Sequence, residues 1–168
     1  MWNSRGGIDL LVNNAGGDPL REFHTMTIDE NLRTLELNLV APVALTHAAL
    51  DGMLSRGRGH IVNVSAMAGR VSFPFTEVYS AAKDGMIGFT RVLRADYHAD
   101  GVSASVLILG AIRGVGQGQR MLDEAGMKTN RFMVPADAVA RAVIKAVRKD
   151  KTELVVMPGP GPARGSSP

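Results

Sequence analysis

Four short, largely apolar runs, separated by longer stretches, are the feature of this sequence that most limits its fold. Runs of this length without strict polar alternation are typical of strands buried on both faces of a parallel sheet. The predicted strands are Ile8–Asn13, His60–Ser65, Ser103–Leu109 and Glu153–Met157.

In the stretches between these runs, apolar residues recur every three or four positions, which predicts amphipathic helices. One helix is expected over residues 27–55, where "TIDE" has the form of a capping box. Two more are expected over residues 74–98 and 135–149. Alternating strands and helices predict βαβ crossovers, and hence an α/β fold with a parallel sheet of about four strands and helices on its faces.

Residues 114–130 form a less regular segment that is rich in glycine and glutamine. In open α/β sheets, ligands bind outside the carboxyl ends of the strands. The segment therefore has two interpretations, a mobile lid over that edge, with a short helix around 119–125, or a plain surface loop.

Length and composition indicate one domain, over residues 1–157, followed by a Pro-, Gly- and Ser-rich tail at 158–168 that we expect to be disordered. The sequence contains no cysteine, which excludes disulfides and thiolate nucleophiles and fits a reducing cytoplasm, the predicted location. The first residues lack the apolar core of a signal peptide, and no apolar run approaches the length of a membrane span. We therefore expect no membrane association.

The charge pattern argues against two further classes of partner. The net charge is +3, but the arginines are scattered, and the only basic cluster, at 141–151, suits the solvated end of a helix. We therefore expect no nucleic-acid binding. The four histidines have no ligand spacing with one another or with carboxylates, so we expect no metal site.

The segment "YSAAK" places Tyr79 and Lys83 four residues apart, on one face of a helix. A phenol has a pKa near 10, and a neighbouring ammonium group lowers it by favouring the phenolate. By itself the pair is weak evidence, because a core tyrosine beside a surface lysine has the same spacing. Its context is more specific. Ser65 ends a predicted strand, and Asn38 is a polar residue within the apolar helical run "LELNLVAP".

Over nearly its whole length the sequence resembles the short-chain dehydrogenase/reductase family. The resemblance depends on four segments, "LVNNAG" at 11–16, "LELNLVAP" around Asn38, "IVNVSAMAG" at 61–69 and "YSAAKDGMIGFTRVLRAD" at 79–96. It implies the C-terminal portion of a Rossmann-like, doubly wound parallel sheet. It also implies an oxidoreductase that moves hydride between NAD or NADP and a small carbonyl or secondary alcohol.

The resemblance also implies roles for individual residues. Ser65 and Tyr79 would bind the substrate oxygen, with Tyr79 as the general acid/base. Lys83 would bind the nicotinamide ribose and lower the pKa of Tyr79, aided by the cationic nicotinamide, while Asn38 would hold a water of a proton relay. The implied cofactor contacts are Asn14, Ala15, Gly16, Tyr79, Lys83 and Ile112.

The sequence departs from the family pattern in two places. After the third strand it reads "LILGAIRG", with Leu109 and Gly114 where the family usually has a proline and a threonine. More importantly, no strand with a Gly-rich phosphate-binding turn precedes Ile8. We therefore expect a fragment whose first strand is an unpaired edge and whose dinucleotide binding is weak. The choice between NAD and NADP is not encoded in what remains.

Two functional hypotheses follow. The first is the oxidoreductase described above. The second is a catalytically inactive fragment or interaction subunit that keeps the family fold with little dinucleotide binding. In either case the resemblance implies a homodimer or homotetramer formed through the helices at 27–55 and 74–98.

Overall fold

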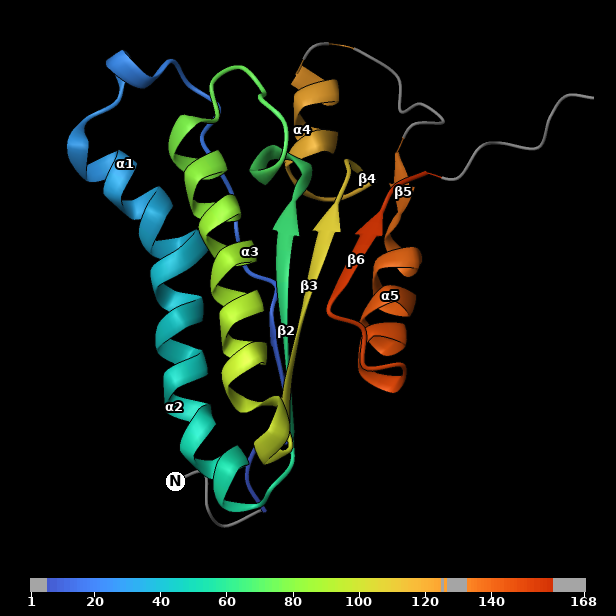
Figure 1. The fold of residues 1–168 in the computed structure, drawn as a ribbon. Helices are drawn as coiled ribbons and strands as arrows, with labels where there is room; N and C mark the ends of the chain where they lie inside the picture. Colours follow the sequence, from blue (N-terminus) through green and yellow to red (C-terminus); the bar gives the residue numbers. More distant parts are fainter. Residues whose placement is uncertain (1–5, 125, 127–132, 159–168) are drawn as a thin grey trace, which may run out of the picture.

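A four-stranded parallel sheet forms the centre of the protein (Figure 1). The computed structural model describes residues 6–124, 126 and 133–158. The strand order is β1-β2-β3-β6, and every neighbouring pair is parallel. The strands are β1 (Leu10–Asn13), β2 (Gly59–Ala66), β3 (Val102–Leu109) and β6 (Glu153–Val156). The predicted α/β class, the parallel order and all four predicted strands are confirmed.

The helices cover the two faces of this sheet unequally. One face carries α1 (Ile28–Leu35), α2 (Ala41–Ser55) and α3 (Glu77–Tyr97), and the other carries α5 (Ala136–Arg148) (Figure 1). The capping box of Thr27 and Glu30 is present at the start of α1.

The core divides in the same way. Between the sheet and α2 and α3 lie Ala49, Met53, Ile61, Leu93, Val102 and Ala104. Against α5, a smaller cluster joins Val62, Leu107 and Ala146. Successive residues of β2 therefore pack on opposite faces, as strand geometry requires. This explains why the strand reads as a nearly continuous apolar run.

The predicted helix over 27–55 is continuous but not uniform. A π-helical segment, η3 (Glu36–Val40), separates α1 from α2. Pro42 follows it closely and has no N–H to donate to the carbonyl of Asn38, so the regular α-helical ladder is interrupted there. The helical stretch therefore departs from regular α-helical geometry just before Pro42.

The segment after β3 is more ordered than the sequence indicated. A short strand, β4 (Ile112–Arg113), pairs in parallel with β5 (Val134–Pro135), and α4 (Gly116–Glu124) follows β4. α4 lies above the carboxyl ends of the main strands (Figure 1). The short helix was predicted; the second sheet was not.

β1 forms an edge of the main sheet. Among the described residues, no strand pairs with its outer side, and Leu10 and Val12 are 45% and 38% exposed. The expectation of an unpaired edge stays a prediction for the whole chain, because residues 1–5 lie outside the described part. Of the predicted tail, only Pro158 lies within the described residues.

By length and composition, the helical stretch Ile28–Ser55 could cross a membrane, which the sequence analysis did not foresee. The buried core helices of soluble proteins and N-terminal signal sequences pass the same test, and 28% of the most apolar window of this stretch is buried. In the structure the stretch lies along one face of the sheet (Figure 1).

Candidate active site

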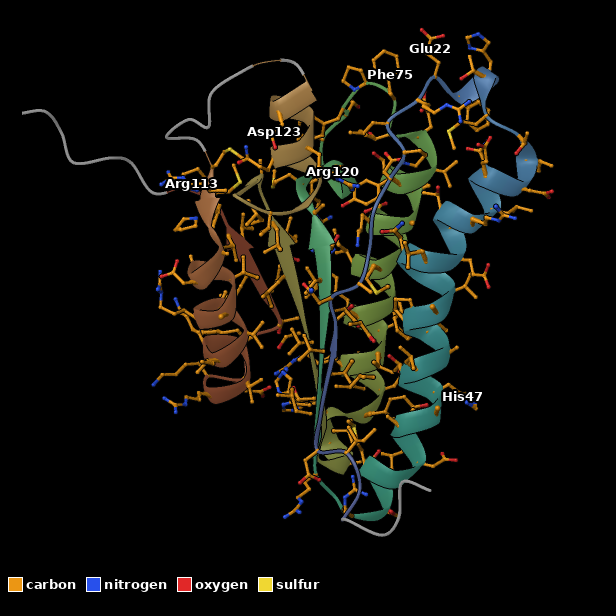
Figure 2. The ribbon with its side chains drawn as sticks, turned by 180° about the vertical axis from the view of Figure 1, so that it is seen from behind. Glu22, His47, Phe75, Arg113, Arg120 and Asp123 are labelled. Atoms are coloured by element: carbon orange, nitrogen blue, oxygen red, sulfur yellow. The ribbon has the colours of Figure 1, made fainter. Side chains whose placement is uncertain are left out.

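The candidate site is a cavity of about 810 Å³ at the carboxyl ends of β2 and β3. Its lining residues come from the loop after β1, the end of β2 and the loop that follows it, α3, the segment after β3, and the ends of α5 and β6. Segments that are far apart in the sequence therefore converge at one sheet edge, as is usual for ligand sites of α/β folds. Figure 2 shows Phe75, Arg120 and Asp123 at this end of the molecule, with His47 on α2 far from it.

Tyr79 and Lys83 lie on the face of α3 that lines this cavity. The Lys83 Nζ lies 5.4 Å from the centroid of the Tyr79 ring and donates a hydrogen bond to the Val64 carbonyl at 3.1 Å. Within the described part of the chain, no hydrogen bond engages the Tyr79 phenol. The pair is therefore close together, with the hydroxyl of Tyr79 available to a ligand.

Burial controls the ionisation of both groups. Desolvation raises the pKa of Tyr79 to about 12, and the negative charge of Asp18 adds to this effect. Desolvation also lowers the pKa of Lys83 to about 8. Within the chain itself, burial disfavours both charged forms, so Lys83 by itself does not lower the tyrosine pKa. The expected lowering, aided by a cationic nicotinamide, stays a prediction. A further positive charge in the cavity would be needed to bring Tyr79 toward neutral pH.

The hydroxyl of Ser65 is not directed to a free position in the cavity. Ser65 is 2% exposed, and its Oγ donates to the backbone carbonyl of Lys83 at 2.8 Å. This bond ties the end of β2 to α3. The next residue, Ala66, lines the same cavity and carries no hydroxyl. The predicted contact of Ser65 with a substrate oxygen is therefore not favoured by this geometry, although Ser65 and Tyr79 border the same cavity.

Asn38 is fully buried and holds the loop after β1 in place. Its Nδ2 donates to the carbonyls of Gly17 at 2.7 Å and Thr34 at 2.8 Å, and its Oδ1 accepts from the Gly17 N–H at 3.1 Å. The expectation that a buried Asn38 would be hydrogen-bonded is confirmed. Its side chain acts on the backbone of this loop; the proposed water relay stays a prediction.

The loop that Asn38 holds approaches Lys83 very closely. A Cβ atom on Gly16 would lie 2.7 Å from Asn38 Oδ1 and 3.0 Å from Lys83 Nζ, so only glycine fits without movement. Asn14, Gly16 and Ile112 line the cavity, whereas Ala15 does not. Gly16, Lys83 and Ile112 thus border one cavity, in which the nicotinamide end of a dinucleotide could lie. Lys83, Gly16 and the Ile112 backbone would hold that end.

The sequence analysis missed the apolar wall of the cavity. That wall includes Leu20, Met67, Phe73, Phe75, Val115 and Val139. One signal was present in the sequence, since "VSFPF" at 71–75 places three large apolar residues in a loop directly before Tyr79.

The fold and the cavity define a Rossmann-type α/β protein with a ligand site at the strand carboxyl ends. Comparison with known proteins makes this specific. The short chain dehydrogenase family model matches residues 2–125, and the chain belongs to that family.

Three similar proteins illustrate the relationship. Ketoacyl reductase HetN of Nostoc is 34% identical over 162 residues, covering 92% of this chain and 53% of its own. Dehydrogenase/reductase SDR family member 7B of Danio rerio is 34% identical over 166 residues, covering 94% and 52%. A short-chain dehydrogenase structure from Streptomyces avermitilis has a TM-score of 0.76 at 27% identity, covering 90% of this chain and 61% of that one. The chain thus spans about half the length of the curated relatives that it matches.

Proposed function

We propose that this chain carries the catalytic half of an NAD- or NADP-dependent oxidoreductase that interconverts a carbonyl and a secondary alcohol. The observation that carries the proposal is the Tyr79–Lys83 pair, which lines one cavity together with Gly16 and Ile112. Membership of the short chain dehydrogenase family supports the same class of reaction.

In this proposal Tyr79 is the general acid/base. In the direction of reduction, the phenol donates its proton to the carbonyl oxygen as the carbon receives hydride, and in oxidation it takes that proton back. A bound nicotinamide dinucleotide supplies or accepts the hydride. Lys83 lies next to the phenol, and its positive charge favours the anionic form of the phenol. Asn38 positions the loop of Asn14 and Gly16 through the Gly17 backbone.

The proposal is tested by following the oxidation of NADH and of NADPH with a panel of ketones, for the chain and its Tyr79→Phe variant. The variant keeps the ring but loses the proton, so we expect turnover to fall by a factor of about 10² or more. Equal turnover in both proteins would refute the proposed role of Tyr79.

A second candidate function is a non-catalytic subunit that keeps the fold and binds dinucleotides weakly. One observation favours it, the engagement of the Ser65 hydroxyl with the Lys83 carbonyl. The variant Ala66→Ser helps to separate the two, because it adds a hydroxyl to the cavity without disturbing Ser65. A gain of turnover supports the enzyme, while inactivity of both proteins with every ketone and both dinucleotides supports the subunit.

We also propose a homodimer or homotetramer formed through α2 and α3, in the cytoplasm, without nucleic-acid or membrane partners. The exposed apolar residues of these helices, which include Leu45 and Val92, support the self-association.

A further inference from the structure

The cavity beside Tyr79 carries almost no charge. Of its described lining residues, Lys83 alone bears a charged side chain, and its Nζ is already bonded to the Val64 carbonyl. The other polar side chains are few. Ser65 donates to the Lys83 carbonyl, and Thr76 donates to the Phe73 carbonyl at 2.8 Å. A carboxylate or phosphate in the substrate would therefore find no free cationic partner among the described lining residues.

The loop that follows β2 has two sides of different character. A second hollow behind it, of about 430 Å³, includes the charged residues Arg70, Glu77 and Asp84. None of these three lines the main cavity, whereas Phe73 and Phe75 line both hollows. The charged side chains of this loop and of the start of α3 thus lie outside the main cavity.

Phe73 and Phe75 are unusual for surface residues. They are 50% and 49% exposed, two positions apart, at the rim of the cavity. Phe75 also has a φ of 63°, a left-handed conformation that is costly for a bulky residue. Such strain at the edge of a cavity is typical of a segment shaped for a ligand. Figure 2 shows Phe75 at the end of the molecule above the strands, on the loop before α3.

We propose that the substrate is an uncharged ketone or secondary alcohol with an extended apolar group, and that Phe73 and Phe75 bind this group. The reactive oxygen would lie at Tyr79, so this inference rests on the proposed function. The apolar group would cover the two phenyl rings and the wall formed by Leu20 and Val115. A cavity of this size is within the range that binds drug-sized molecules.

The test is isothermal titration of the chain, without dinucleotide, with methyl ketones of increasing length from pentanone to undecanone. Each buried methylene group is expected to raise the affinity about fourfold. The α-keto acids of matching length are expected to bind more weakly than the ketones. Affinity that does not depend on chain length, or α-keto acids that bind as tightly as the ketones, would overturn the inference.

Variants then locate the binding site. Phe73→Ala and Phe75→Gly are each expected to lower the affinity for the longest ketone about tenfold. Phe75→Gly also removes the strained conformation, so its urea midpoint should rise and exclude misfolding as the cause. Phe23→Ala is the matched control, because Phe23 is 51% exposed and does not line the cavity. Equal losses in the control would contradict the assignment.

These measurements separate the inference from the proposed function. If ketone affinity follows chain length and depends on the two phenylalanines but no turnover occurs, the oxidoreductase proposal fails and the substrate class holds. If turnover occurs equally well with short or charged ketones, the substrate class fails and the oxidoreductase proposal holds.

Discussion

At the scale of single residues, Ser65 is the position where sequence and structure lead to different roles. Its hydroxyl is buried and donates to the Lys83 carbonyl, which fixes the helix that carries Tyr79 against β2. Ser65 therefore affects the site by positioning α3, and with it Tyr79, against β2.

The variant Ser65→Ala tests this role. It removes the hydrogen bond from the end of β2 to the Lys83 carbonyl, which keeps its hydrogen bond within α3, so we expect the free energy of unfolding to fall by about 0.5–1.5 kcal/mol in urea titrations. Ser72→Ala is the control, because Ser72 is exposed and makes no hydrogen bond within the described residues. Unchanged stability with lost turnover would instead indicate that the hydroxyl contacts the substrate.

Lys83 gives the stability a defined pH dependence. Its pKa falls from 10.5 to about 8 on folding because burial penalises the ammonium group. Between these values the unfolded chain holds more protons than the folded chain, so stability rises with pH above about 8. Lys83→Met should abolish this rise between about pH 8 and pH 10. It should also raise the free energy of unfolding at pH 7 by up to about 3 kcal/mol.

Lys145→Met on α5 is the control for this experiment, because Lys145 is exposed. If the free energy of unfolding of Lys83→Met still rises above pH 8, or if both variants show the same pH profile, burial of Lys83 is not the cause of the pH dependence.

At the scale of elements, the π-segment η3 connects the helix at 28–55 to the site. It places Asn38 so that its amide bonds both the N–H and the carbonyl of Gly17. The position of the loop after β1, and hence of Gly16 beside Lys83, depends on an irregularity in a helix that lies on the face of the sheet.

Asn38→Ala removes three hydrogen bonds and leaves the Gly17 backbone groups unpaired. We expect a loss of about 2–4 kcal/mol in the free energy of unfolding and faster hydrogen exchange at the Gly17 amide. Asn31→Ala is the comparison, since its side chain makes one such bond, to the Thr27 carbonyl. Slow exchange at Gly17 in the Asn38 variant would show that the loop is held by other contacts.

Prediction from sequence succeeded where the signal is local and periodic. The strands, the capping box at Thr27 and the pairing of Tyr79 with Lys83 on one helical face all follow from residue spacing. It failed where the outcome depends on burial or on contacts between distant segments. The bond from Ser65 to Lys83 and the pairing of β4 with β5 belong to this second group.

At the scale of the whole molecule, the described residues expose apolar side chains in two regions. One is the outer side of β1, where Leu10 and Val12 are exposed. The other extends over α1, α2 and α3, with Ile28, Leu32, Leu45 and Val92 each more than half exposed. Apolar surface of this extent favours association with another chain.

Val92→Asp tests the proposed assembly through α3. Val92 is 61% exposed, and a carboxylate at the centre of an apolar contact would be buried without a partner. Light scattering after size exclusion is expected to show a shift from dimer or tetramer toward monomer. Ile144→Asp on α5, which is 51% exposed, should leave the mass unchanged. Loss of assembly in the Ile144 variant alone would place the contact on the other face.

We expect the carboxyl ends of β2 and β3, beside Tyr79 and Lys83, to bind the nicotinamide end of a dinucleotide. This binding is tested most directly by titrating the isotope-labelled chain with reduced nicotinamide mononucleotide and recording amide chemical shifts. We predict that the amides of Gly16, Lys83 and Ile112 shift, while those of His98 and Asp150, at the opposite edge, do not. Shifts confined to other parts of the molecule, or none at saturating ligand, would contradict the account.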